Sequence, residues 1–118
     1  MVTVRHLGDF RVTQGGASIP STAFSVRIVD HTPDELTLPQ STVRILTKGM
    51  RTIYPTAGVS FNGSTCFAYS YGNLTLLPND DFTYPAPLCF VLGVPGQPAE
   101  TPADLLVGVG PTVFFKLK

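Results

Sequence analysis

Charge is what this sequence has least of. Eight basic and eight acidic residues make up 14% of its 118 residues, whereas about 25% of a typical soluble domain is charged. The chain has no run of like charges and no basic arm, so it lacks the electrostatic footprint of a nucleic-acid-binding protein. We therefore expect no nucleic-acid partner, and a surface that is either unusually neutral or partly covered by another protein.

Long apolar segments are also missing. No stretch approaches the ~20 apolar residues that cross a bilayer, and the first residues lack the apolar region and cleavage site of a signal peptide. No helical apolar periodicity is sustained over several turns. We therefore expect no membrane contact and no long helix.

Catalytic motifs are missing as well. Residues 58–62, Gly-Val-Ser-Phe-Asn, approach the nucleophile elbow of hydrolases, but the last glycine of that motif is absent and no helix is predicted to follow. The two histidines, His6 and His31, lie far from Ser60 in the sequence. We expect no catalytic residues and no cofactor. A polar pocket holding His6 or His31 would be the first sign of an enzyme instead.

Metal-binding patterns are weak. Acidic residues gather at 30–35 and at Asp80 and Asp81, but without the spaced carboxylates of a calcium loop, and Asp is also a common turn residue. Cys66 and Cys89 have neither the spacing nor the histidine partners of a zinc or redox site. We expect no metal site. Two buried free thiols are the favoured interpretation, with a disulfide as the alternative.

What the chain does contain is β-like sequence. Eleven glycines and eleven prolines punctuate short runs of β-branched, aromatic and aliphatic residues. The predicted strands cover residues 2–7, 9–13, 24–30, 35–38, 42–47, 50–54, 59–61, 65–71, 73–77, 82–84, 88–94, 105–109 and 112–117. This spacing predicts an all-β, single-domain antiparallel β-sandwich of jelly-roll or Greek-key type over residues 1–118. At most one short helical turn is expected, at 101–106, with Thr101 as N-cap and Pro102 as the first helical residue.

The centre of this predicted fold is residues 52–94. This stretch holds both cysteines, all four tyrosines and only two charged residues. The apolar phases of the strands predict a common core of Phe24, Val26, Ile28, Val43, Ile45, Phe67, Leu76, Phe90, Leu92 and Val113. A faint internal echo, Leu-Thr-Leu-Pro at 36–39 and Leu-Thr-Leu-Leu-Pro at 74–78, is given little weight.

By exclusion, the sequence predicts a non-enzymatic structural protein. The chain resembles virion surface proteins in general character only, as a compact, charge-poor β-chain rich in Pro, Gly, Thr and Val. We expect a viral structural protein, either a capsid decoration (cement) protein or a small jelly-roll coat protein. Its partners would be itself, as a homo-oligomer, or a major capsid protein. It would reside in the virion after assembly in the host cytoplasm, and the missing basic arm favours the outer, decorating position.

Two segments are predicted to form the interface, because both lie outside the regular strand-turn pattern. They comprise Met1, Val2, Thr3 and Val4 at the start of the chain and Pro95, Gly96, Gln97 and Pro98 in the longest predicted loop. Removing residues 1–7 would then abolish assembly and leave the fold intact. The alternative function is a carbohydrate- or receptor-binding module, with Tyr69 and Tyr71 on one face of their strand as the ligand face.

Overall fold

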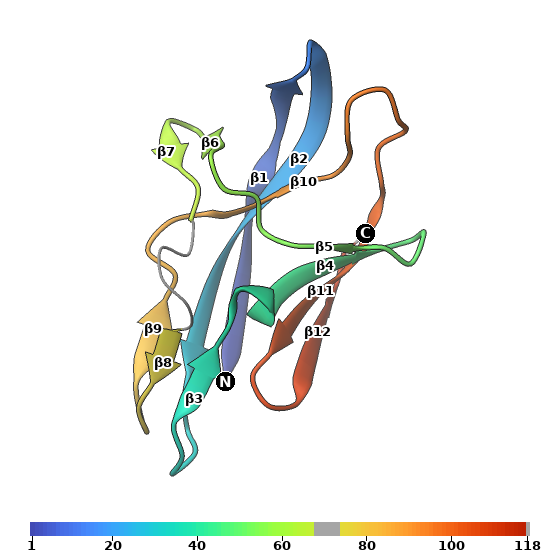
Figure 1. Cartoon of the computed structure of the whole chain (residues 1–118). Helices are drawn as coiled ribbons and strands as arrows, with labels where there is room; N and C mark the ends of the chain where they lie inside the picture. The colour runs from blue at the N-terminus through green and yellow to red at the C-terminus, as the bar shows by residue number, and fades with distance from the viewer. Residues whose placement is uncertain (68–73, 118) are drawn as a thin grey trace.

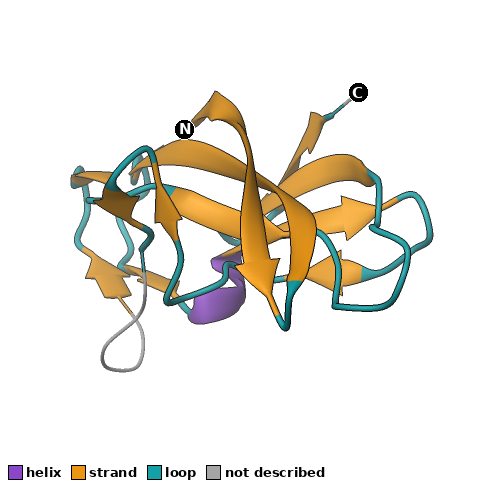
Figure 2. Ribbon diagram, turned by 90° about the horizontal axis from the view of Figure 1, so that it is seen from above, coloured by secondary structure: helices purple, strands orange, loops and turns teal. Residues whose placement is uncertain are grey.

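The computed structural model describes residues 1–67 and 74–117. The expected all-β fold is confirmed: the described strands form two four-stranded and two two-stranded antiparallel sheets (Figure 1). Within these residues the only helical element is a single 3₁₀ turn, η1 (Gln40–Thr42), drawn in purple in Figure 2. This arrangement agrees with the frequent turn residues and the lack of helical periodicity in the sequence.

The first four-stranded sheet is built on a long hairpin. Strands β1 (Val2–Gln14) and β2 (Ala17–Val29) pair along their whole length. The other edge of β2 pairs with β10 (Leu88–Val91) and with β9 (Asp81–Thr83). The two short strands predicted on either side of Gly8 are therefore one strand, interrupted only by a β-bulge between His6 and Gly8.

The second four-stranded sheet has the order β12-β11-β4-β5. It contains β4 (Val43–Thr47), β5 (Thr52–Ile53), β11 (Pro102–Gly108) and β12 (Thr112–Lys116). The β4–β5 hairpin predicted around Lys48 and Gly49 is confirmed.

The helical turn predicted at 101–106 is wrong. Pro102 is the first residue of β11, which pairs with β4 on one side and β12 on the other. A proline is tolerated at the first residue of a strand. The local N-cap signal is therefore overridden by two ladders of backbone hydrogen bonds, which outweigh a weak helical preference.

The two smaller sheets are each a pair of short strands. β3 (Leu36–Leu38) pairs with β8 (Leu74–Leu76), so the two halves of the Leu-Thr-Leu echo lie side by side, residue against residue. β6 (Ser60–Phe61) pairs with β7 (Ser64–Thr65). The Asn-Gly turn at 62–63 joins β6 to β7 as predicted, with φ of 48° and 79°, as in a type I′ turn.

The main core takes side chains from both four-stranded sheets. Phe24, Val26 and Ile28 of β2 alternate inward, as predicted, whereas Ser25 and Arg27 face outward. The buried members of the main core are Phe24, Val26, Ile28, Leu38, Val43, Ile45, Leu76, Tyr84, Leu88, Phe90, Leu92, Leu105 and Val107. Two predicted core residues differ: Phe67 is half-buried against this cluster, and Val113 is half-buried outside it.

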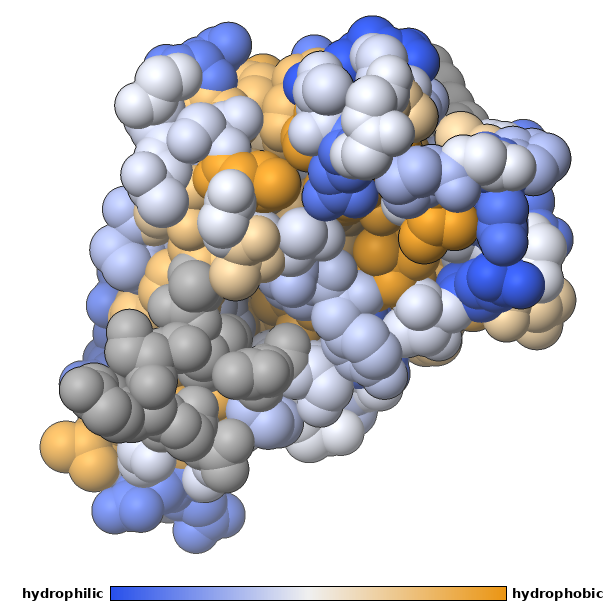
Figure 3. All heavy atoms as spheres, turned by 45° about the horizontal axis from the view of Figure 1, so that its top comes forward, coloured by the Kyte–Doolittle hydropathy of each residue, from blue (hydrophilic) through white to orange (hydrophobic). Residues whose placement is uncertain are grey.

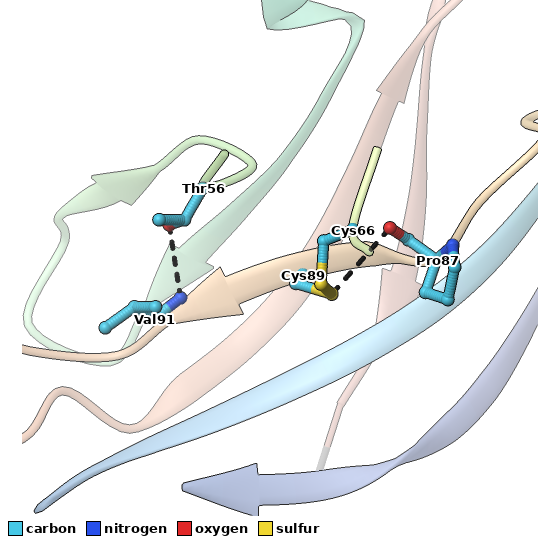
Figure 4. The surroundings of a disulfide bond; sticks show 5 residues. All are labelled: Thr56, Cys66, Pro87, Cys89 and Val91. Carbon is cyan, nitrogen blue, oxygen red and sulfur yellow. Dashed lines mark hydrogen bonds between the residues drawn. A yellow bond between two sulfur atoms is a disulfide. The ribbon is translucent and has the colours of Figure 1, made fainter. Parts of the chain in front are cut away.

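A second, smaller core contains a disulfide between Cys66 and Cys89, so the favoured prediction of two free thiols is wrong (Figure 4). The Cα atoms of the two cysteines lie 5.8 Å apart, and both residues are buried. Backbone hydrogen bonds place the strands for this contact, because Phe67 N donates to Pro87 O and Thr56 N donates to Cys89 O. The disulfide therefore fastens the chain after β7 to β10.

Candidate functional site

A groove runs beside β1, between the two four-stranded sheets. One part has a volume of about 360 Å³ and is lined by His6, Asp9, Thr22 and Phe24 from the first sheet and by Pro102, Lys116 and Leu117 from the C-terminal part of the chain. The adjoining part, of about 420 Å³, shares Asp9 and Pro102 and adds Phe10, Arg11, Pro20, Ser21 and Leu92. We call this feature the β1 groove.

The bulge in β1 sets the chemistry of this groove. His6 lies opposite Phe24 and Asp9 lies opposite Thr22, while Leu7 has no partner in β2. In an uninterrupted strand, residues three apart point to opposite faces of the sheet. The extra residue of the bulge cancels this alternation, so the imidazole of His6 and the carboxylate of Asp9 share one face.

His6 is held by two polar partners. Its Nε2 atom lies 3.1 Å from Asp9 Oδ1 and 3.0 Å from Thr22 Oγ1, and its ring centroid lies 5.1 Å from that of Phe24. A catalytic relay needs a carboxylate on one ring nitrogen and the nucleophile on the other. Here both partners contact the same nitrogen. The β1 groove does hold His6, but its lining is mainly apolar, and these contacts position the ring without forming such a relay.

Other residues considered for catalysis lie elsewhere. His31 is exposed just after β2, and Ser60 is exposed in β6; neither lines the β1 groove. Within residues 1–67 and 74–117, no three His, Cys, Asp or Glu side chains are grouped so that they would hold a metal ion.

Two acidic side chains instead have structural partners. Asp81 accepts hydrogen bonds from Arg27, with an Nε–Oδ1 distance of 2.8 Å, and this contact lowers the pKa of Asp81. Asp30 Oδ1 accepts from the hydroxyl of Thr32 at 2.7 Å and from its backbone N–H at 3.0 Å, which lowers the pKa of Asp30. The Asp81 carboxylate therefore joins β9 to β2, and the Asp30 carboxylate orders the turn that follows β2.

The N-terminal interface segment is part of the first sheet. Val2 pairs with Ile28, Thr3 with Arg27 and Val4 with Val26, and both valines pack against the main core. The backbone of Met1 adds two hydrogen bonds to Val29, including one donated by its ammonium group. The expectation that residues 1–7 form an arm outside the strand pattern is therefore wrong.

The second predicted interface segment lies at the other end of β1. Pro95, Gly96, Gln97 and Pro98 are exposed, and Pro95 lies beside the Gly15 turn that ends β1. At ~3.3 Å per residue, the length of β1 separates the two segments by about 40 Å. The structure does not gather them into one patch, and β1 is the element that connects them.

The predicted ligand face cannot be placed in the same way. Tyr69 and Tyr71 lie outside the described residues.

The β1 groove was not anticipated as a site, since its side chains come together only through the bulge and through contacts between distant strands. Gly8, which divides two short predicted strands, was the only local sign of an irregular strand there.

The outer edge of β1 is open in the described part of the chain. β1 pairs with β2 on one side, and no strand among residues 1–67 and 74–117 pairs with the other. Large apolar side chains are exposed at Met1, Met50, Tyr54, Leu77, Val94 and Phe114. Figure 3 shows apolar patches on the face it draws, set in surface of intermediate hydropathy, with strongly hydrophilic residues in separate groups.

No family model, curated protein or solved structure matches this chain. Among its described residues, no helix has the length and apolar character needed to cross a bilayer.

Proposed function

We propose that the chain is a non-enzymatic structural protein of a virus particle, either a decoration (cement) protein or a small coat protein, with a β-sandwich of jelly-roll or Greek-key type. It acts by associating with itself or with a major capsid protein. The observation that carries this proposal is the open edge of β1, a strand of 13 residues. Unpaired strand edges are templates for pairing with another chain.

The neutral surface supports the same proposal. With only 14% charged residues and several exposed apolar side chains, the chain has few groups that keep a protein monomeric by repulsion. A partner that covers part of this surface removes apolar area from water. The virion location, after assembly in the host cytoplasm, follows from the general resemblance to virion surface proteins, and this protein would contact neither membrane nor nucleic acid.

Sedimentation velocity tests the proposal, with the chain alone and mixed with candidate virus particles, at low and high salt. We expect an oligomer or a particle-bound fraction, through an interface of at least ~1,000 Å². Binding should weaken only slightly with salt, because few ion pairs are available to be screened. A stable monomer that binds no particle would overturn the proposal, as would binding that collapses in modest salt.

The β1 groove favours a second candidate, a carbohydrate- or receptor-binding module. It brings an imidazole, a carboxylate and the ammonium of Lys116 beside the apolar surfaces of Phe24 and Pro102, a combination that suits a polar ligand with an apolar face. A glycan array with the wild-type chain and an Asp9→Asn variant tests it. Binding that is lost in the variant supports this function, and an array without signal rejects it for the glycans tested.

A further inference from the structure

The backbone of β1 points its hydrogen-bonding groups outward at alternate residues. Pro20, opposite Arg11, directs its carbonyl away from β1, because that oxygen accepts from Leu92 N at 3.0 Å. Arg11 and Pro20 therefore form a non-hydrogen-bonded pair, in which the backbone groups of both residues face away from each other. The same alternation applies to Asp9, two residues earlier. Asp9 and Arg11 thus present free N–H and C=O groups at the sheet edge.

The side chains of these two residues carry opposite charges on one face. Asp9 lies opposite Thr22 and Arg11 lies opposite Pro20, so both point to the face that bears the β1 groove. Asp9 is 78% exposed in its side chain and contacts His6. Arg11 is exposed as well and donates to the hydroxyl and carbonyl of Ser18 in its own hairpin, so pairing with a second copy exchanges or shares these surface contacts. Phe10, between them, packs edge-on against Phe61 of the smaller core with a centroid distance of 5.2 Å.

We propose that a second copy of this chain pairs with the second half of β1 in antiparallel register, about a two-fold axis at Phe10. Asp9 of each copy then lies directly opposite Arg11 of the other, and the first four-stranded sheet of one copy becomes continuous with that of the other. The inference deepens the proposed function, on which it rests, because it names the surface through which the chain self-associates.

Charge selects this register from its neighbours. Outward-facing backbone groups must meet outward-facing groups, so allowed registers differ by shifts of two residues. A shift in one direction places Asp9 opposite Asp9 of the second copy, and a shift in the other places Arg11 opposite Arg11. Like charges directly opposite each other destabilise a strand pair, and opposite charges stabilise it. The register centred on Phe10 makes two favourable pairs at once.

The bulge limits where this pairing extends. Between His6 and Gly8 the strand changes register, and an irregular edge resists continued pairing. Residues 8–12 therefore form the regular segment, and Arg5 lies beyond the bulge. The Asp9 and Arg11 side chains of the second copy would approach the β1 groove, since the same residues of the first copy line it.

Charge reversal tests the inference through sedimentation velocity of the full chain. We expect wild-type dimers, and at least about a tenfold weaker self-association for Asp9→Arg and for Arg11→Asp, because each places like charges opposite each other twice. Mixing the two variants should restore dimers, because the mixed pair again has opposite charges at both positions. Arg5→Asp is the matched control and should dimerise like the wild type. Circular dichroism confirms that each variant is folded.

The outcomes separate this inference from the proposed function. Self-association that resists both charge reversals, or single variants that stay monomeric when mixed, would overturn the β1–β1 register while leaving self-association in place. A wild-type monomer that binds virus particles would overturn the inference and keep the proposed function. A monomer that binds nothing would overturn both.

Discussion

At the scale of single residues, the main core depends on a few large side chains. Phe90 is fully buried in β10, and its ring packs edge-on against Phe24 with a centroid distance of 6.0 Å. Aromatic pairs in this geometry add to the free energy gained from burial alone. By contrast, Phe114 in β12 is 61% exposed. The two phenylalanines therefore make a matched pair for testing the core.

Phe90→Ala should lower the free energy of unfolding by ~3–5 kcal/mol, because it removes buried surface and leaves a cavity. Phe114→Ala should change it by less than ~1 kcal/mol, as expected for an exposed site. Urea unfolding followed by circular dichroism measures both. A loss under 1 kcal/mol for Phe90→Ala would show that this ring does not belong to the core.

The paired carboxylates predict how stability depends on pH. Hydrogen bonding lowers the pKa of Asp81 and of Asp30 in the folded chain, whereas an unfolded Asp titrates near ~3.9. A lowered folded pKa contributes stability that is present above the unfolded pKa and is lost as the pH falls through the folded pKa. The free energy of unfolding should therefore decrease as the pH is lowered below about 4.

Breaking the Arg27–Asp81 pair should flatten this acid dependence. Asp81→Asn removes the titrating group, and Arg27→Gln removes the partner that lowers its pKa. Urea unfolding between about pH 2 and 6 should give a shallower slope for both variants than for the wild type. Curves parallel to the wild type would contradict the assignment.

At the scale of elements, the disulfide joins segments that are otherwise held by only short ladders of backbone hydrogen bonds. β6 and β7 are two residues each, and the bond ties the chain beyond them to β10 (Figure 4). The loop it closes spans 23 residues, a length for which restricting the unfolded chain contributes about 3 kcal/mol.

Cys66→Ala combined with Cys89→Ala should therefore lower the free energy of unfolding by ~3 kcal/mol. A thiol reductant should lower the stability of the wild type by a similar amount and leave the double variant unchanged, which provides the control. Two reactive thiols in the denatured, unreduced wild type would show instead that the bond is absent.

Local chemistry explains which elements were predictable. Asn62 and Gly63 tolerate positive φ and carry a turn signal of their own, and the alternation of Phe24, Val26 and Ile28 marks a strand with one buried face. The strand predicted at 105–109 is present as β11, but its start at Pro102 depends, like the bulge and the disulfide, on partners distant in sequence. The β1 groove, with side chains from both ends of the chain, carries no local signal at all.

At the scale of the whole molecule, residues 1–7 are an integral part of the fold, whereas the sequence suggested an arm outside the strand pattern. Val2 and Val4 cover the main core, and residues 2–6 continue the ladder with β2. Removing residues 1–7 should then lower the free energy of unfolding by more than ~2 kcal/mol, from lost apolar burial and lost strand pairing.

Urea unfolding of the truncated chain tests this, with the exposed-site variant Thr3→Ala as the control that should match the wild type. A truncated chain that keeps wild-type stability would support the original expectation that residues 1–7 form an arm outside the strand pattern. A destabilised one means that assembly at this end has to be tested by substitutions in β1, since truncation removes fold and interface together.

The strand order also determines when each sheet can form while the chain is being synthesised. β1 and β2 are neighbours in sequence, but the other edge of β2 gains its partners only when β9 and β10 have been made, and β4 gains its second partner only with β11 (Figure 1). At ~5–20 residues per second, the long hairpin leaves the ribosome several seconds before either four-stranded sheet can close. A lone two-stranded hairpin is marginally stable in water. During that interval it presents both of its edges to other nascent chains, so crowded translation is where this protein is most exposed to mispairing.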